Sequence, residues 1–138
     1  MTDSDRYARS LGGQVRGFSL VELLIVVAVI AILATTAWPS YMAYKVRANR
    51  GAAQTVMMDM ANRQQQHFLD ARAYTTSNAV LGHAALPAEV APFYAIVVTT
   101  VAGPPPTYAI TATPVFGSAQ IDDGSLVLNG DGTRSGKW

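Results

Sequence analysis

The chain contains one apolar run that is long enough to cross a membrane. From Phe18 to Trp38 there are 21 residues with a single charged side chain, Glu22. At 1.5 Å of rise per residue, a helix of that length spans roughly 30 Å, the thickness of a bilayer's hydrocarbon core. A carboxylate inside such a segment is costly and indicates a functional role by default. The run predicts a membrane helix in which Glu22 either has a specific task or reaches the lipid headgroups.

The segment before the run does not look like a secretory signal peptide. Residues 1–17 are polar, whereas a signal peptide carries an apolar segment of about 7–15 residues before its cleavage site. Here a candidate junction, Gly17-Phe18, precedes the apolar run. Cleavage at that junction would leave the whole run on the mature protein.

The residues around this junction resemble the start of a type IV pilin. Phe18-Ser19-Leu20-Val21-Glu22 follows directly after Arg16-Gly17, and the resemblance covers about residues 9–44, including Pro39. It implies that a prepilin peptidase cuts after Gly17 and that the new amino terminus, Phe18, is methylated. It also implies that Glu22, the fifth residue of the mature chain, acts in assembly.

The same resemblance implies an organisation into three parts. Residues 1–17 would be a prepilin leader peptide, residues 18–42 a transmembrane and filament-core helix, and residues 43–138 a soluble globular pilin domain. The expected fold is the α+β type IV pilin fold, in which a long N-terminal helix packs on a small antiparallel β-sheet. The expected location is the bacterial inner membrane, with a single span, and then the extracellular pilus after assembly.

Helix signals continue beyond the apolar run. One face carries small, apolar or long side chains at a spacing of three to four residues, which is typical of an amphipathic helix: Ala53, Met57, Met60, Ala61, Gln64 and Phe68. We expect one helix from about Phe18 to Ala71. Pro39 lies inside it and should cause a kink or local loosening, because it leaves the Thr35 carbonyl without its N–H donor. The hydroxyls of Thr35 and Thr36 could satisfy freed carbonyls.

The remainder of the chain predicts an irregular segment followed by strands. Residues 72–92 contain Gly82, Pro87 and Pro92, which favour a connection without regular structure. Strands are then expected at residues 93–101, 107–113 and 125–129, with a short fourth strand between residues 133 and 138. Between the first two strands, Gly103-Pro104-Pro105-Pro106 predicts a stiff hairpin loop. The layout is a helix followed by an antiparallel meander.

Composition narrows the possible functions. The chain has 10 basic and 9 acidic side chains, a net charge of +1, which argues against nucleic acid as the main partner. It has no cysteine, so a C-terminal disulfide of the kind common in pilins is excluded. We therefore expect the C-terminal loop to be held by packing alone.

No enzyme or cofactor site is predicted. The two histidines, His67 and His83, lack the spaced partners that a catalytic triad or a metal cluster needs. Asp122, Asp123 and Asp131 lie in glycine-containing turns and could together suggest calcium. Two ordinary turns explain the same residues, so no metal site is assigned.

The resemblance implies a structural subunit of a type IV pilus, with roles in adhesion, twitching motility or DNA uptake. Residues 124–129 and the terminal Trp138 also resemble PilE-like minor pilins. The implied partners are other pilin subunits in a homo- or hetero-polymer, the prepilin peptidase, an inner-membrane assembly platform and, before assembly, the lipid bilayer. The alternative is a pseudopilin of a type II secretion system, which shares the leader and the anchor.

Overall fold

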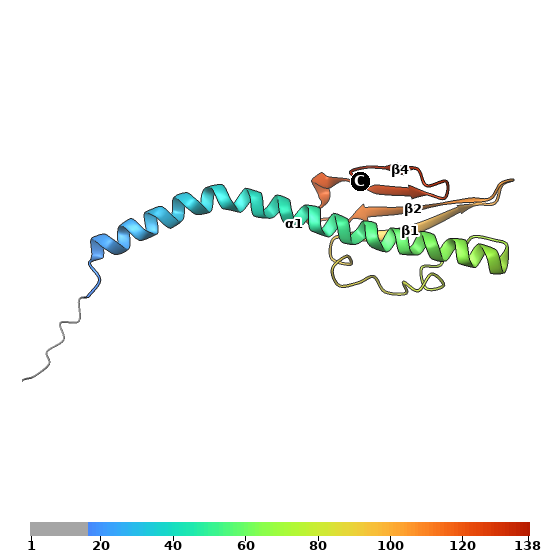
Figure 1. Ribbon diagram of the computed structural model, residues 1–138, viewed down its shortest axis with the longest axis horizontal. Helices are drawn as coiled ribbons and strands as arrows, with labels where there is room; N and C mark the ends of the chain where they lie inside the picture. The colour runs from blue at the N-terminus through green and yellow to red at the C-terminus, as the bar shows by residue number, and fades with distance from the viewer. Residues whose placement is uncertain (1–16) are drawn as a thin grey trace, which may run out of the picture. The chain divides into compact units, whose positions relative to one another are not determined.

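One long helix and a four-stranded sheet dominate the part of the chain that the structure describes (Figure 1). A computed structural model describes residues 17–138. Helix α1 spans Leu20–Ala71, and the strands are β1 (Tyr94–Val101), β2 (Thr107–Pro114), β3 (Leu126–Asn129) and β4 (Arg134–Ser135). A short 3-10 helix, Ile121–Asp123, precedes β3. The leader predicted at residues 1–17 lies outside the described residues, apart from Gly17.

Helix α1 continues through Pro39 without a break. The Thr35 hydroxyl donates to the Ile32 carbonyl at 2.7 Å, and the Thr36 hydroxyl donates to the Leu33 carbonyl at 3.0 Å. Both hydroxyls therefore serve carbonyls that lie before Thr35 in the chain, and neither serves the Thr35 carbonyl that Pro39 frees. A kink at Pro39 stays a prediction. The chain divides into two compact units after Pro39.

The part of α1 before Pro39 is apolar and fully exposed. Its large apolar side chains, from Leu20 to Trp38, are all exposed, as is Phe18 just before the helix. An 18-residue window of α1 has a mean hydropathy of 2.7, and none of that window is buried. Among residues 17–138, α1 is the one helix long and apolar enough to cross a membrane.

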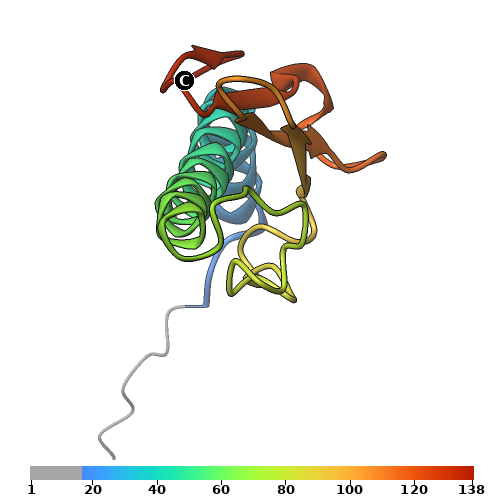
Figure 2. The ribbon, with the colours of Figure 1, turned by 90° about the vertical axis from the view of Figure 1, so that its right-hand side faces the viewer.

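In the second unit, one stripe of α1 packs on one face of the sheet (Figure 2). The stripe consists of Ala53, Val56, Met57, Met60 and Gln64. Alternate residues of each strand face it, because side chains along a strand point to opposite sides in turn: Tyr94, Ile96 and Val98 of β1, Tyr108, Ile110 and Ala112 of β2, and Leu126 and Leu128 of β3. The predicted helix stripe is confirmed around Met57 and Met60, while Ala61 and Phe68 are only half-buried.

The sheet is an antiparallel meander in the order β1-β2-β3-β4. Tyr94 pairs with Pro114 at one end of the first hairpin, and Val101 pairs with Thr107 at the other. The fourth strand is shorter than predicted and is limited to Arg134–Ser135. The α+β architecture expected from the sequence is confirmed.

The connection between α1 and β1 has no regular structure, as predicted, but it is tied to the core. Gln64 is fully buried on the α1 stripe, and its side-chain amide makes two hydrogen bonds to the backbone of Thr75. Its NH2 group donates to the Thr75 carbonyl, and its oxygen accepts from the Thr75 N–H at 3.0 Å. The Asn78 side chain donates to the Ile96 carbonyl of β1 at 2.9 Å. A buried polar side chain is tolerated here because it is hydrogen-bonded.

The stripe predicts a strong contrast between two neighbouring methionines. Met60 is fully buried, whereas Met58 is exposed. Met60→Asp should lower the free energy of unfolding by about 4 kcal/mol or more, because it buries an unpaired charge. Met58→Asp should change stability by only about 0.5 kcal/mol. Thermal unfolding of the two detergent-solubilised variants tests this, and equal losses would contradict the packing of α1 on the sheet.

Candidate functional site

The predicted cleavage and assembly residues lie together at the start of α1. Gly17, Phe18, Ser19 and Glu22 line an open hollow of about 410 Å³. The Leu23 N–H donates to the Ser19 carbonyl at 3.1 Å, so the helix begins almost directly after Phe18. Glu22 is therefore in the first helical turn, where a carboxylate interacts favourably with the helix dipole.

The structure brings together the residues predicted for cleavage, methylation and assembly, but not the predicted kink residue. Gly17, Phe18 and Glu22 share the hollow, whereas Pro39 lies much further along α1. A cut after Gly17 would place a new amine at one side of the hollow and the Glu22 carboxylate at another. Cleavage at Gly17, methylation of Phe18 and the assembly role of Glu22 stay predictions.

A second group of functional side chains holds the loop of residues 115–125 against α1. Arg50 Nη1 lies 2.7 Å from Asp123 Oδ1, and the two side chains are 18% and 4% exposed. The Tyr94 hydroxyl donates to the other oxygen of Asp123 at 3.0 Å. Burial raises the pKa of the Tyr94 hydroxyl above its ordinary value.

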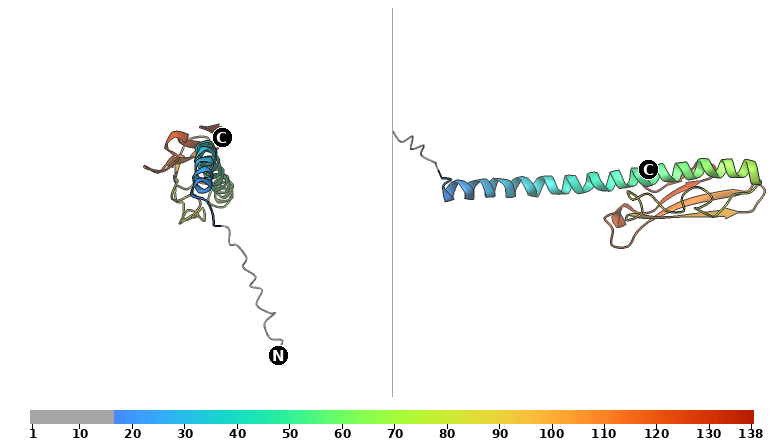
Figure 3. Two further views of the ribbon diagram at one scale, coloured as in Figure 1. Left: turned by 90° about the vertical axis from the view of Figure 1, so that its left-hand side faces the viewer. Right: turned by 90° about the horizontal axis from the view of Figure 1, so that it is seen from below.

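Gln120 completes this group, which we name the loop anchor: Arg50, Tyr94, Gln120 and Asp123. The Gln120 side-chain amide donates to the Val46 carbonyl at 3.1 Å and to the Tyr94 hydroxyl oxygen at 3.1 Å. Every member lies at the end of the sheet where β1 begins and β2 ends. The view from below in Figure 3 shows this loop beside α1.

The loop anchor corrects one expectation from the sequence. The C-terminal loop is not held by packing alone, because an ion pair and several hydrogen bonds tie it to α1 and β1. Arg50 and Asp123 are 73 residues apart in the chain, so no local pattern links them. The acidic turn that contains Asp123 suggested calcium binding instead.

Two of the three aspartates considered for calcium bind other groups of the protein. Asp123 accepts from Arg50 and Tyr94. Asp131 accepts from the hydroxyl and the N–H of Thr133, and these bonds hold the pKa of its carboxyl below the usual range. Within residues 17–138, no group of three or more His, Cys, Asp or Glu side chains could hold a metal ion.

A third cluster holds the segment before β1 against the exposed side of α1. Asp59 Oδ2 lies 2.8 Å from Arg63 Nε and 2.8 Å from His83 Nε2. Hydrogen bonds from Arg63 and then His83 hold the pKa of the Asp59 carboxyl below its usual range. Gly82 has a φ of +76°, and a Cβ there would lie 2.7 Å from Arg63 Nη1. The glycine therefore lets the backbone approach the guanidinium closely.

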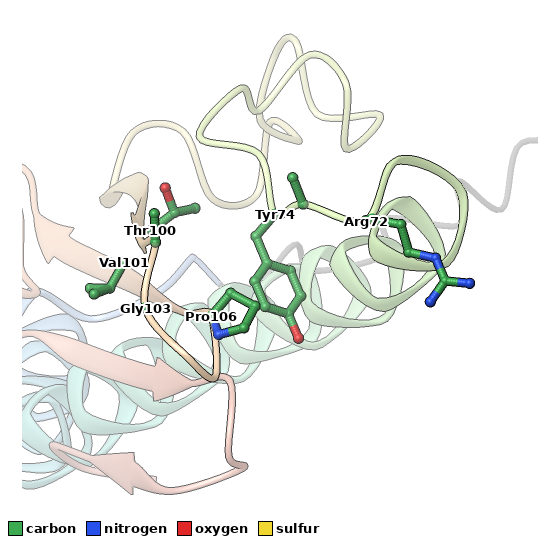
Figure 4. A pocket seen from close by; sticks show the side chains of 8 residues that line it. Arg72, Tyr74, Thr100, Val101, Gly103 and Pro106 are labelled. Carbon is green, nitrogen blue, oxygen red and sulfur yellow. The ribbon is translucent and has the colours of Figure 1, made fainter.

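The other end of the sheet carries a hollow of about 270 Å³, which Figure 4 shows. Arg72 and Tyr74 line it on one side, and Thr100, Val101, Gly103 and Pro106 line it on the other. Tyr74 is fixed by aromatic neighbours, since its ring stacks on Phe68 and meets the edge of Tyr108, each at 4.7 Å between centroids.

The fold and the N-terminal helix define a type IV pilin-like protein. A family model described as "Type IV minor pilin ComP, DNA uptake sequence receptor" matches residues 39–126. A second model, "Prokaryotic N-terminal methylation motif", matches residues 13–38. The chain therefore belongs to the type IV minor pilin family that the first model describes.

Curated relatives agree with this membership. The chain is 39% identical over 66 residues to the type IV wide pilus major component PilA4 of Thermus thermophilus, covering 48% of the chain and 50% of that protein. It is 37% identical over 60 residues to the major pilin PilA of Myxococcus xanthus, covering 44% and 27%. It is 31% identical over 75 residues to a major pilin PilE1 of Neisseria gonorrhoeae, covering 54% and 46%. In these matches the chain spans half or less of each relative's length.

The loop anchor predicts that Asp123 is critical for stability. Asp123→Ala leaves the Arg50 charge and the Tyr94 hydroxyl without their partner. Removing one member of a buried ion pair typically costs about 3–5 kcal/mol. Asp131→Ala is the matched control, because Asp131 is an exposed aspartate that bonds only within its own turn. Chemical denaturation of both variants measures the difference, and an Asp123→Ala protein as stable as Asp131→Ala would refute the anchor.

The Asp59 cluster predicts a pH-dependent contribution to stability. Because folding lowers the pKa of Asp59, its contribution is present above the unfolded pKa of about 4 and is lost as pH falls through the folded value. Asp59→Asn should lower the melting temperature slightly at pH 7, since the carboxylate is partly exposed, and the gap should close towards pH 3. Asp70→Asn is the control. A gap that stays constant across this range would show that Asp59 acts through packing.

Proposed function

We propose that this chain is a structural subunit of a type IV pilus that polymerises through the first half of α1. The observation that carries the proposal is the exposed apolar helix that follows a matched N-terminal methylation motif. Lipid and apolar side chains are similar solvents for such a helix, so the subunit can exchange a bilayer for neighbouring helices at little hydrophobic cost. Contacts that repeat without closing a ring produce an open helical fibre.

Processing prepares the helix for this exchange. In the proposal, prepilin peptidase cuts after Gly17 and methylates Phe18, and an inner-membrane assembly platform moves the subunit into the filament. Residues 18–42 then form the filament core, and residues 43–138 form the soluble domain outside it. The buried cluster of the second unit, which includes Met57, Met60, Tyr94 and Ile110, supports an independently folded domain.

Glu22 is proposed to set the register between subunits. Cleavage leaves a positive amine at Phe18, and the Glu22 carboxylate of a neighbouring, staggered subunit can neutralise it. Each charge alone would carry a desolvation penalty of several kcal/mol in an apolar core. The pair therefore selects correctly staggered neighbours. A purely anchoring Glu22 that reaches the lipid headgroups is the competing explanation.

The pseudopilin alternative has no observation that favours it. The leader and anchor are common to both classes. The relatives are major components of pili, and the matched family is one of minor pilins. Two of the three aspartates considered for calcium, Asp123 and Asp131, are engaged in internal contacts.

DNA binding is a second candidate, because the family description names a DNA uptake sequence receptor. Our expectation from charge was that nucleic acid is not the main partner. In residues 17–138, four cations have no carboxylate within salt-bridge distance: Lys45, Arg47, Arg72 and Arg134. They could neutralise only a few phosphates, so a single subunit would bind weakly and with a shallow salt dependence.

The register role predicts a selective assembly defect. The Glu22→Ala and Glu22→Gln proteins should insert into the membrane and be cleaved normally. Their intact masses should match a mature chain that starts at a methylated Phe18. Their incorporation into filaments should fall by more than about tenfold, since an unpaired amine in an apolar core costs about 3–5 kcal/mol. Immunoblots of sheared filaments against total membranes measure this, with Ser19→Ala, a neutral change in the same hollow, as control. Normal incorporation of both variants would overturn the register role.

The DNA candidate predicts weak, salt-sensitive binding by one subunit. Fluorescence anisotropy with duplex DNA should give a plot of log association constant against log salt concentration with a slope no steeper than about −3.6, since four contacts contribute about −0.9 each. Arg72→Ala with Arg134→Ala should reduce that slope by about 2, whereas Arg63→Ala, whose cation is paired with Asp59, should leave it unchanged. No binding at low salt would remove DNA as a partner of the subunit.

A further inference from the structure

The loop of residues 115–125 presents two large apolar side chains that the proposed function does not use. Phe116 is 97% exposed and Ile121 is 48% exposed. The loop is not a loose segment, because the Ser118 N–H closes a turn on the Val115 carbonyl at 3.0 Å and the loop anchor fixes Gln120 and Asp123. A structured turn therefore holds Phe116 outward.

This loop is fastened to the first turns of α1 that belong to the soluble unit. Gln120 contacts the Val46 carbonyl, and Asp123 contacts Arg50. Tyr41 and Tyr44, both exposed, precede these contacts on α1, and Tyr44 is only two residues, about 3 Å of helical rise, before Val46. Tyrosines at the end of a membrane helix sit at the headgroup level. The loop is thus attached close to the level of the lipid headgroups.

The charges around the loop suit an anionic lipid surface. A hollow of about 370 Å³ beside it is lined by Arg47, Arg50 and Lys137 together with Asp122 and Asp123. Arg50 is matched by Asp123, and Lys137 Nζ lies 3.6 Å from the same carboxylate. Arg47 has no carboxylate within salt-bridge distance in the described part of the chain, and neither does Lys45, which lies over the Tyr41 ring. Three cations, Arg47, Arg50 and Lys137, therefore face two carboxylates around this hollow, and Lys45 follows Tyr44 directly on α1.

We propose that Phe116, Ile121, Lys45 and Arg47 form a bilayer-docking surface that rests the soluble domain on the membrane before assembly. Phe116 and Ile121 enter the boundary between headgroups and acyl chains, and the two free cations contact lipid phosphates, as in interfacial amphipathic segments. The inference rests on the proposed membrane anchor. Docking of this kind orients the domain while the subunit waits in the membrane, and extraction into a filament releases it.

The absence of cysteine makes a direct test simple, since one introduced cysteine carries a single label. Phe116→Cys is labelled with a nitroxide on the full chain, which is reconstituted at low density in vesicles of phosphatidylethanolamine and phosphatidylglycerol. Oxygen and water-soluble nickel then report lipid and water accessibility. Val101→Cys is the matched control, because Val101 is 61% exposed at the opposite end of β1. Ala31→Cys reports the anchor itself.

The expected result is a label at 116 that is accessible to oxygen and protected from nickel, while the label at 101 behaves as in water. Lys45→Gln and Arg47→Gln should each reduce the ratio of docked to free domain about fivefold, the contribution of one cation near an anionic surface. Arg134→Gln, an equal charge change on β4, should not. Vesicles of phosphatidylcholine alone should weaken docking as the two variants do.

Other outcomes overturn the proposal and are distinguishable. If the label at 31 is not in lipid, the anchor itself has failed. If the label at 31 is in lipid but the labels at 116 and 101 are equally wet, only the docking surface is wrong. Disulfide cross-linking between unlabelled Phe116→Cys subunits at low density would assign the surface to a second copy. Protection of the label at 116 by duplex DNA without vesicles would assign it to nucleic acid.

Discussion

The rest of the structure depends on a helix whose first half no other part of the described chain covers. Up to Tyr44 its large apolar side chains are exposed, and from Val46 onward one side begins to be buried. The first half needs an apolar environment from outside, and lipid or other helices provide it equally well. The second half buries one narrow stripe against the sheet and leaves its other side exposed. Helix α1 therefore combines a half that needs an apolar environment from outside with a half that packs on the sheet.

A domain with this task has to keep its C-terminal loop in place without a disulfide. The loop anchor does so with one buried ion pair, between Arg50 and Asp123. The Tyr94 hydroxyl donates to the second oxygen of Asp123, and Gln120 in turn donates to that hydroxyl. A buried pair contributes little net free energy compared with an apolar contact, but it strongly penalises any arrangement in which one partner is missing. The anchor thus specifies where the loop sits more than it adds stability. It also places Phe116 at a defined end of the sheet.

The sequence was sufficient for features that repeat locally and insufficient for contacts between distant segments. The spacing of Met57 and Met60 predicted the helix stripe, because periodicity follows directly from backbone geometry. The pairing of Arg50 with Asp123 depends on how the loop after β2 meets α1. That meeting is fixed by sheet register and not by any local pattern. The pairing of Asp59 with His83 was missed for the same reason.

The distribution of charge limits what one copy of the domain can bind. Arg50, Arg63 and Lys137 lie within salt-bridge distance of carboxylates in the described chain, which leaves four separate cations. A surface with so few free charges binds a polyanion weakly, because each phosphate contact releases about one counterion. In a polymer, however, the same cations recur in every copy, and linked sites raise the overall affinity well above that of one site. Weak binding of a polyanion by the isolated subunit is therefore compatible with firm binding by a filament. The helix through which the subunits polymerise would then determine the overall affinity of any binding surface on the domain.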